Sequence, residues 1–153
     1  MVARPGVPAK DLAELTAWVK QNSGRVSAGT SGVGTPSHVS GVYYEKLTGT
    51  SLQFIPYRGT GPAVQDLMGG QIDLMFDQAS NSLPHVRAAK IRAYAVTAKT
   101  RLPSAPDVPT VDEAGLPGLY ISVWHGIWVP RGTPKDAVAK LNAAVDRKST
   151  RLN

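Results

Sequence analysis

The feature that most constrains this chain is a regular alternation of short apolar runs with longer amphipathic segments. Runs that predict strands lie at 25–28, 52–56, 72–76 and 91–97. The segments between them carry apolar residues at three- and four-residue spacing, which predicts helices. Strands that alternate with helices favour an α/β domain with a mostly parallel sheet, flanking helices and right-handed crossovers.

Proline and glycine mark the ends of the predicted helices. Pro36 and Pro62 stand where a first helical turn would begin, a position that tolerates the missing N–H, and Gly49 is typical of the residue after a helix. The helices are predicted at 8–23, 36–48, 62–68 and 83–88, with a small one opened by the capping-box pattern 110–113 and a last one from 133. The apolar positions are Val39, Val42, Tyr43 and Leu47 in the second helix and Val138, Leu141 and Val145, as a buried stripe, in the last.

Composition indicates one ordinary globular domain. The chain has 153 residues, of which 42% are hydrophobic and 18% charged, and it contains no cysteine for disulfide or thiolate chemistry. No apolar run reaches the roughly 20 residues that cross a bilayer, so we expect no direct membrane insertion. The first residues also lack the apolar stretch of a secretory signal sequence.

The formal charge of +6 comes partly from the last residues, where Arg147, Lys148 and Arg151 lie within 147–153. Elsewhere Lys and Arg are scattered, whereas a nucleic-acid surface normally shows a basic stripe. We therefore expect no nucleic-acid partner. A modest positive charge suits a protein that binds organic anions.

Three loops are candidates for a ligand site, because ligands of open α/β sheets bind beyond the carboxyl ends of the strands. These loops are residues 29–35, 57–61 and 77–82. All three lie at the strand-to-helix end, so we expect them to be neighbours in space.

The first of these loops, Gly29-Thr-Ser-Gly-Val-Gly-Thr35, is the strongest candidate for an anion site. Its glycines allow a ligand to approach the main chain, its hydroxyls can donate hydrogen bonds, and a helix N-terminus follows. A plain glycine-rich turn with Thr35 as N-cap is the competing interpretation. Neither a Walker A loop nor a dinucleotide fingerprint fits, because the lysine and the glycine spacing are absent.

The other candidates each have a structural alternative. His38 can face the ligand or pack within its helix, and Arg58 can grip a carboxylate or be a solvated loop charge. Asp77 can hold a ligand amine, orient water or fix the glycine loop, and we favour the structural role. The predicted ligand contacts are Thr30, Ser31, Gly32, Gly34, Thr35, His38, Arg58, Gly59 and Asp77.

No catalytic arrangement is evident in the sequence. There is no Gly-x-Ser-x-Gly elbow, and His85 and His125 have no companion at metal-ligand spacing. We therefore expect no enzyme activity, no metal and no cofactor. The extended segment 120–130 carries Trp124 and Trp128 on one face, and core or hinge packing is the favoured interpretation of both rings.

Several segments, in order, resemble the tripartite tricarboxylate transporter substrate-binding proteins, also called the Bug (Bordetella uptake gene) family. They are Gly29-Thr-Ser-Gly-Val-Gly-Thr-Pro-Ser-His38, Pro56-Tyr-Arg-Gly59, Pro62-Ala-Val-Gln-Asp-Leu-Met-Gly-Gly70, Ile72-Asp-Leu-Met-Phe-Asp77, Ala93-Tyr-Ala-Val-Thr97, the stretch from Pro109-Thr110-Val111 to Gly115, and Trp124-His-Gly-Ile-Trp-Val-Pro-Arg-Gly-Thr-Pro134. The resemblance covers about residues 2–146.

This resemblance implies a periplasmic receptor with the two-domain type II solute-binding fold, which closes over a small carboxylate and feeds membrane transporter subunits. Residues 1–130 would be the second, ligand-closing domain, and 131–146 the start of the return to a first domain that is absent from this fragment. Residues 147–153 depart from the family and are interpreted as a non-native tail. Ser31, Gly34 and Thr35 would then contact the carboxylate. The alternatives are an effector-sensing domain of a transcription regulator and an α/β enzyme that binds an anionic substrate.

Overall fold

The computed structural model describes residues 1–124 and 126–149. The chain divides into two compact units, Met1–Val123 and Trp124–Asn153. His125 and the end of the predicted tail, 150–153, lie outside the described residues. How residues 1–130 and 131–146 are shared between two domains stays a prediction.

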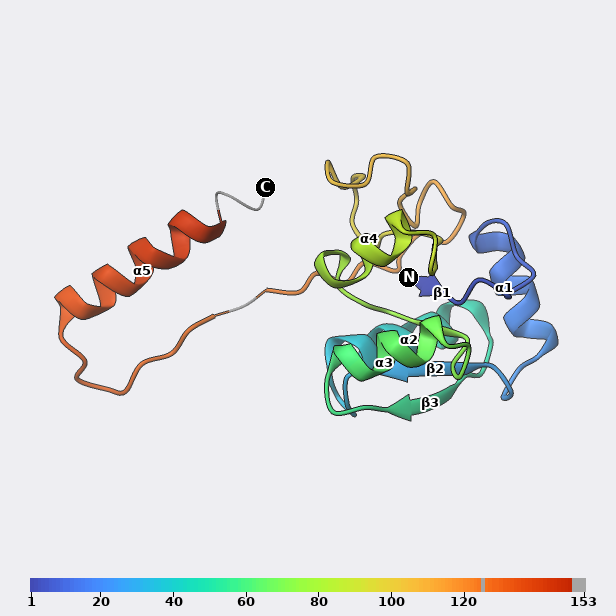
Figure 1. The fold of residues 1–153 in the computed structure, drawn as a ribbon, viewed down its shortest axis with the longest axis horizontal. Helices are drawn as coiled ribbons and strands as arrows, with labels where there is room; N and C mark the ends of the chain where they lie inside the picture. The colour runs from blue at the N-terminus through green and yellow to red at the C-terminus, as the bar shows by residue number, and fades with distance from the viewer. Residues whose placement is uncertain (125, 150–153) are drawn as a thin grey trace. The chain divides into compact units, whose positions relative to one another are not determined.

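The first unit is built on a five-stranded sheet, which confirms the α/β class. The strands, in the order β3-β2-β4-β1-β5, are β3 (Gln53–Pro56), β2 (Ser27–Thr30), β4 (Leu74–Met75), β1 (Val2–Ala3) and β5 (Arg92–Ala93). β2 lies between β3 and β4 and is parallel to both, while β1 is antiparallel to β4 and β5. Figure 1 shows β2 and β3 side by side with their arrows in the same direction. The sheet is therefore mixed, with β1 running against the other strands.

β2 begins and ends two residues later than the predicted strand 25–28, and β4 is shorter than the predicted 72–76. Two other strands differ more from the prediction. β1 was not predicted, because two residues ahead of Pro5 and Gly6 show no apolar periodicity. β5 is much shorter than the predicted strand 91–97, and beyond it Val96 forms only an isolated parallel bridge with Thr110. Short strands of this kind are fixed by the neighbouring strands and not by local sequence.

Helices cover both faces of this sheet. They are α1 (Leu12–Gln21), α2 (Pro36–Thr48), α3 (Thr60–Met68) and α4 (Ala79–Arg87), and the second unit contains α5 (Lys135–Ser149). Successive strand residues point to opposite faces: Leu74 packs with α1 and α2, and Met75 packs with α3 and α4. In the described residues, no helix is long and apolar enough to cross a membrane.

The apolar face predicted for α2 is wrong at three of its four residues, since only Tyr43 packs against the core. Val39, Val42 and Leu47 are exposed, whereas Ser40, Gly41 and Tyr44 are buried. The reason is close packing on the sheet: a Cβ at position 41 would overlap the ring of Phe54. Small residues therefore point inward, and the valines remain outside.

The prediction of a small helix opened by residues 110–113 is also wrong, although the capping box itself forms. The Glu113 N–H donates to Thr110 Oγ1 at 3.2 Å, and the Thr110 N–H donates to Glu113 Oε2 at 2.8 Å. The segment makes a turn that ends at Gly115, whose φ of +81° leaves the helical region. A capping box starts a turn but does not extend it.

The second unit carries apolar side chains at its surface, against the prediction of buried packing. Trp124 and Trp128 are 75% and 78% exposed, and their ring centroids lie 6.1 Å apart. Val138, Leu141 and Val145 of α5 are exposed as well. The predicted apolar stripe exists, but nothing in the described residues covers it.

Candidate functional site

The candidate site lies where three neighbouring strands end. Thr30 at the end of β2 is paired with Pro56 of β3, and Gly29 is paired with Met75 of β4. Adjacent strands are about 4.8 Å apart, so the loops that follow them begin side by side. The Tyr57 N–H donates to the Thr30 carbonyl at 2.9 Å, which joins the first two loops.

The loop after β2 is shorter than predicted. Gly29 and Thr30 belong to the strand, and the loop consists of residues 31–35. Gly29 is needed for packing and not for ligand access, because a Cβ there would overlap Cδ1 of Ile72. Thr30 is 1% exposed, and its Oγ1 accepts a bond from the Gly32 N–H at 3.4 Å. The placement of Thr30 therefore does not support its predicted ligand contact.

Gly32 and Gly34 give this loop its path. Their φ values are +132° and +78°, a region that side-chain-bearing residues rarely adopt. At Gly34 an added Cβ would meet no heavy atom within 4 Å, so the space beside this residue is open. Here the glycines serve backbone conformation, as the sequence predicts.

Hydroxyl groups hold the loop together, and Ser37 is their centre. Ser37 Oγ accepts the Ser31 N–H at 2.9 Å and lies 3.0 Å from both Ser31 Oγ and Thr35 Oγ1. The sequence did not single out Ser37. The signal available was a hydroxyl in the first turn of a proline-started helix, which can reach back to the preceding loop.

Thr35 occupies the N-cap position of α2, but its side chain does not cap the helix. Its Oγ1 donates instead to the Gly32 carbonyl at 2.6 Å. In the part of the chain that the structure describes, the N–H groups of Ser37 and His38 have no hydrogen-bond acceptor. The positive end of the α2 dipole and these donors make the loop suitable for an anion.

His38 supports the loop from within α2. Its Nδ1 accepts the Gly34 N–H at 3.2 Å, and its ring packs edge-on against Phe54 with centroids 4.8 Å apart. The imidazole therefore fixes the position of Gly34. Both interactions match the packing alternative for this residue.

The second loop is anchored by Tyr57. Its hydroxyl donates to Asp66 Oδ2 at 2.7 Å, and burial together with the neighbouring Asp66 carboxylate raises the pKa of Tyr57 to about 12. Gly59 precedes α3 with a φ of +106°. Arg58 between them is exposed, and no ion pair among the described residues involves it. Its guanidinium is thus accessible to a ligand.

Asp77 accepts hydrogen bonds from side chains near the beginning of α4. Its Oδ2 accepts the Ser82 hydroxyl at 2.6 Å, and its Oδ1 accepts the Asn81 amide at 3.3 Å. The third loop is consequently shorter than the predicted 77–82, because α4 begins at Ala79. Among the described residues, these bonds give Asp77 a structural role and do not join it to the glycine loop.

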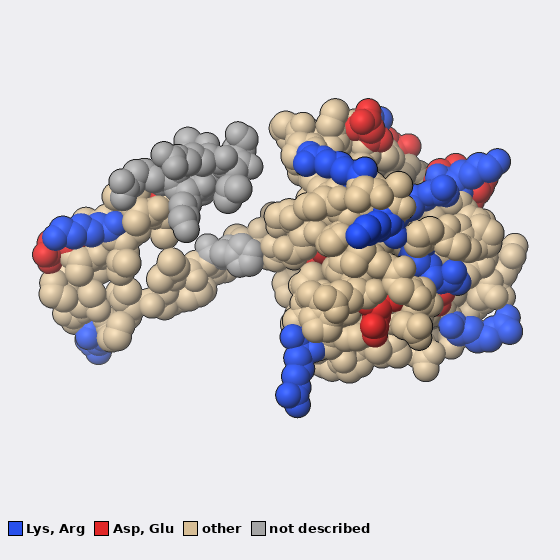
Figure 2. All heavy atoms as spheres, viewed as in Figure 1, with Lys and Arg blue, Asp and Glu red and all other residues tan. Residues whose placement is uncertain are grey.

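The described residues contain no group of three or more histidine and acidic side chains that could hold a metal ion. On the face drawn in Figure 2, Lys and Arg lie in several separate groups. What the geometry of the described residues offers is the unpaired amides of Ser37 and His38, beside a loop of hydroxyl groups and an open space.

A family model described as the tripartite tricarboxylate transporter family receptor matches residues 1–153. The chain belongs to this receptor family. The resemblance seen in the sequence is thereby confirmed. Receptors of this kind bind solutes and are not enzymes, so the family favours neither the regulator nor the enzyme alternative.

Three solved structures of receptors show the same fold. The periplasmic binding protein BugD is 44% identical, with 92% of this chain and 47% of that chain covered and a TM-score of 0.85. MatC from Rhodopseudomonas palustris with bound malate is 43% identical, with coverages of 95% and 50% and a TM-score of 0.88. Rpa4515 from R. palustris with adipate is 33% identical, with coverages of 94% and 48% and a TM-score of 0.90. This chain spans about half the length of these receptors.

Proposed function

We propose that this chain forms one lobe of a periplasmic receptor that binds a small dicarboxylate or a similar organic anion. The receptor passes this solute to the membrane subunits of a tripartite transporter. The observation that carries the proposal is the loop 31–35, where open space adjoins hydroxyl groups and the first amides of α2, which have no acceptor among the described residues. Malate and adipate, bound by two relatives, are both dicarboxylates.

In this proposal one carboxylate of the solute lies against the glycine loop. Ser31, Gly34 and Thr35 contact it, and Ser37 holds their loop in position. The donors are the N–H groups of Ser37 and His38, which have no acceptor among the described residues. Gly32 shapes the same loop, and Arg58 and Gly59 border it from the second loop. Charge-assisted hydrogen bonds from amides and hydroxyls are short and favourable, and they select an anion over a neutral group.

The other lobe is expected from the half of the receptor length that this chain does not span. It would cover the exposed face of α5 and the rings of Trp124 and Trp128, since large apolar surfaces of this kind are normally buried. Binding between two lobes excludes water from the solute and strengthens its hydrogen bonds. Residues 131–146 then lead from one lobe to the other.

The test is calorimetry on the intact two-lobed protein with succinate, malate, adipate and citrate, with succinamide as the neutral counterpart of succinate. We expect binding of at least one dicarboxylate and none of the diamide, because the site offers donors to an anion. Equal binding of succinamide and succinate, or no response to any acid, would contradict the proposal.

A further inference from the structure

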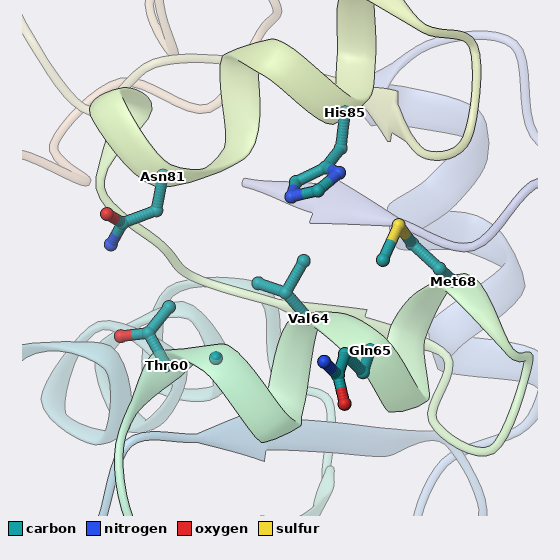
Figure 3. A pocket seen from close by; sticks show the side chains of 7 residues that line it. Thr60, Val64, Gln65, Met68, Asn81 and His85 are labelled. Atoms are coloured by element: carbon teal, nitrogen blue, oxygen red, sulfur yellow. The ribbon is translucent and has the colours of Figure 1, made fainter.

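The first unit has two surface features close to the candidate loops, a groove and an exposed valine. Figure 3 shows the groove between α3 and α4, with Val64 of α3 and His85 of α4 in its lining. Its described lining comes from these two helices and is separate from loop 31–35. The valine is Val33, which belongs to that loop. Because the proposed solute lies against loop 31–35, Val33 is the feature that bears on binding.

Val33 lies in the middle of loop 31–35, with its side chain in solvent. It is 79% exposed, more than any other large apolar side chain described in the first unit. The other members of the loop are serine, threonine and glycine. A single exposed valine is ordinary on a protein surface, so exposure alone identifies no contact. What distinguishes Val33 is how firmly the loop holds it.

The residues on both sides of Val33 are fixed. Gly32 and Gly34 have φ values of +132° and +78°, which only glycine adopts readily. The Gly32 carbonyl accepts Thr35 Oγ1 at 2.6 Å and the Thr35 N–H at 3.4 Å. The Gly34 N–H donates to His38 Nδ1 at 3.2 Å. The loop therefore presents the valine from an ordered main chain, and a contact made by an ordered residue costs little conformational entropy.

What can cover Val33 in the intact receptor follows from the proposed function, on which this inference rests. The loop that holds the solute in this lobe faces the other lobe once the receptor closes. This chain spans about half the length of its relatives, so the other lobe is available to meet the loop. The solute carboxylate is assigned to the amides of Ser37 and His38, whereas an apolar side chain gains by leaving water.

We propose that Val33 is an apolar contact between the glycine loop and the other lobe, formed only when the receptor closes over its solute. Val33 touches the other lobe and not the solute. The contact removes the valine from water and so stabilises the closed state. Because this contact is the same for every solute, it raises the affinity for each by the same factor and slows the release of each.

The experiment measures the affinity of the intact protein for succinate, malate and adipate by calorimetry. Val33→Ser makes the loop tip polar, and Val33→Ile keeps it apolar. The matched control is Val42→Ser, at a valine of α2 that is 45% exposed and lies beyond the first turn of the helix. We expect Val33→Ser to weaken every acid that binds the unmodified protein by roughly five- to tenfold, as for the loss of one buried valine. Val33→Ile and Val42→Ser should bind within twofold of the unmodified protein.

A kinetic readout separates closure from solute contact. Stopped-flow tryptophan fluorescence should show faster release from Val33→Ser and an unchanged association rate, because the contact forms after the solute has entered. An effect that grows with the length of the acid, an effect confined to the association rate, or an equal loss in Val33→Ile or Val42→Ser would overturn the inference. If the unmodified protein binds none of the acids, the proposed function fails. If it binds them and Val33→Ser binds them equally well, this inference alone fails.

Discussion

α1 and α5 have the same kind of sequence and opposite surroundings. Both carry apolar residues at three- and four-residue spacing along one face. On α1 these residues are Leu12, Leu15 and Val19, all buried against the sheet. On α5 they include Leu141, which is 45% exposed.

The difference teaches that periodicity predicts a helix and an apolar face but not what covers it. The apolar face of α1 is covered within the first unit, because it packs into a core whose residues extend along the chain as far as Leu119. The cover of α5 is not among the described residues. An amphipathic helix with an open apolar face fits a chain that spans about half the length of its relatives.

The largest expected effect is on the covered helix. Leu15→Ala should lower the free energy of unfolding by about 2–5 kcal/mol, because it removes a fully buried side chain and leaves a cavity. The matched change Leu141→Ala in this chain should cost less than about 0.5 kcal/mol, as exposed substitutions usually do. Urea denaturation followed by circular dichroism measures both.

In the intact protein Leu141→Ala should become costly, since the second lobe would then cover α5. If Leu141→Ala lowered the free energy of unfolding equally little in this chain and in the intact protein, the proposed cover of α5 would be contradicted. If Leu15→Ala and Leu141→Ala both lowered it by several kcal/mol in this chain, α5 would already be covered here and the contrast between the two helices would be contradicted.

A smaller effect is expected at Asp73, which directly precedes β4 and binds Ser27 of β2 and Arg4, the residue after β1. Its carboxylate accepts the Arg4 Nε–H at 2.9 Å and the Ser27 N–H and hydroxyl at 2.8 Å. Burial alone would raise the pKa of Asp73, but the bonds from Ser27 and Arg4 outweigh it and lower the pKa below 3.8. Asp73→Asn should therefore cost about 1–2 kcal/mol at neutral pH.

The pH dependence follows from the direction of this shift. Because the folded pKa lies below the unfolded value, the stabilisation is fully present above about pH 4 and is lost as the pH falls through the folded pKa. The difference between Asp73→Asn and the unmodified chain should thus shrink as the pH is lowered below about 4 in urea titrations. A constant difference across this range would contradict the assigned bonds.

The smallest effect in stability concerns the exposed rings of the second unit. Trp124→Ser with Trp128→Ser should leave the unfolding midpoint of the first unit unchanged but reduce self-association of this chain, because exposed apolar surface promotes association. Sedimentation velocity at several concentrations measures this. An unchanged self-association constant would show that the two tryptophan rings do not form the interface of self-association.

Much of the fold could be predicted from the sequence, and the errors have physical causes. Strands followed by proline-started helices were recognisable because local chemistry marks their ends. β1 escaped prediction because its pairing with β4 and β5 depends on contacts distant in sequence. The inward face of α2 was mistaken because Gly41 and Ser40 allow close approach to Phe54, which an apolar pattern does not reveal.

The three candidate loops follow neighbouring strands, as predicted, but their internal structure could not be read from the sequence. Gly32 and Gly34 have the positive φ that their loop requires, whereas Gly29 is a packing residue. Ser37 was missed since its role depends on the loop folding back over the first turn of α2. The ligand contacts themselves stay predictions, because they rest on the proposed solute.

The most direct test of the anion site compares two glycines of similar conformation. Gly34 and Gly24 have φ values of +78° and +75°, and neither has a heavy atom within 4 Å of an added Cβ. Gly24 lies between α1 and β2, away from the glycine loop. Alanine at either position should cost a similar amount of stability.

Binding should separate them. In calorimetry of the intact protein with its best dicarboxylate, Gly34→Ala should weaken affinity at least tenfold, because the methyl group enters the space assigned to the carboxylate. Gly24→Ala should bind within twofold of the unmodified protein. Equal affinities for the two variants would show that the glycine loop does not hold the solute.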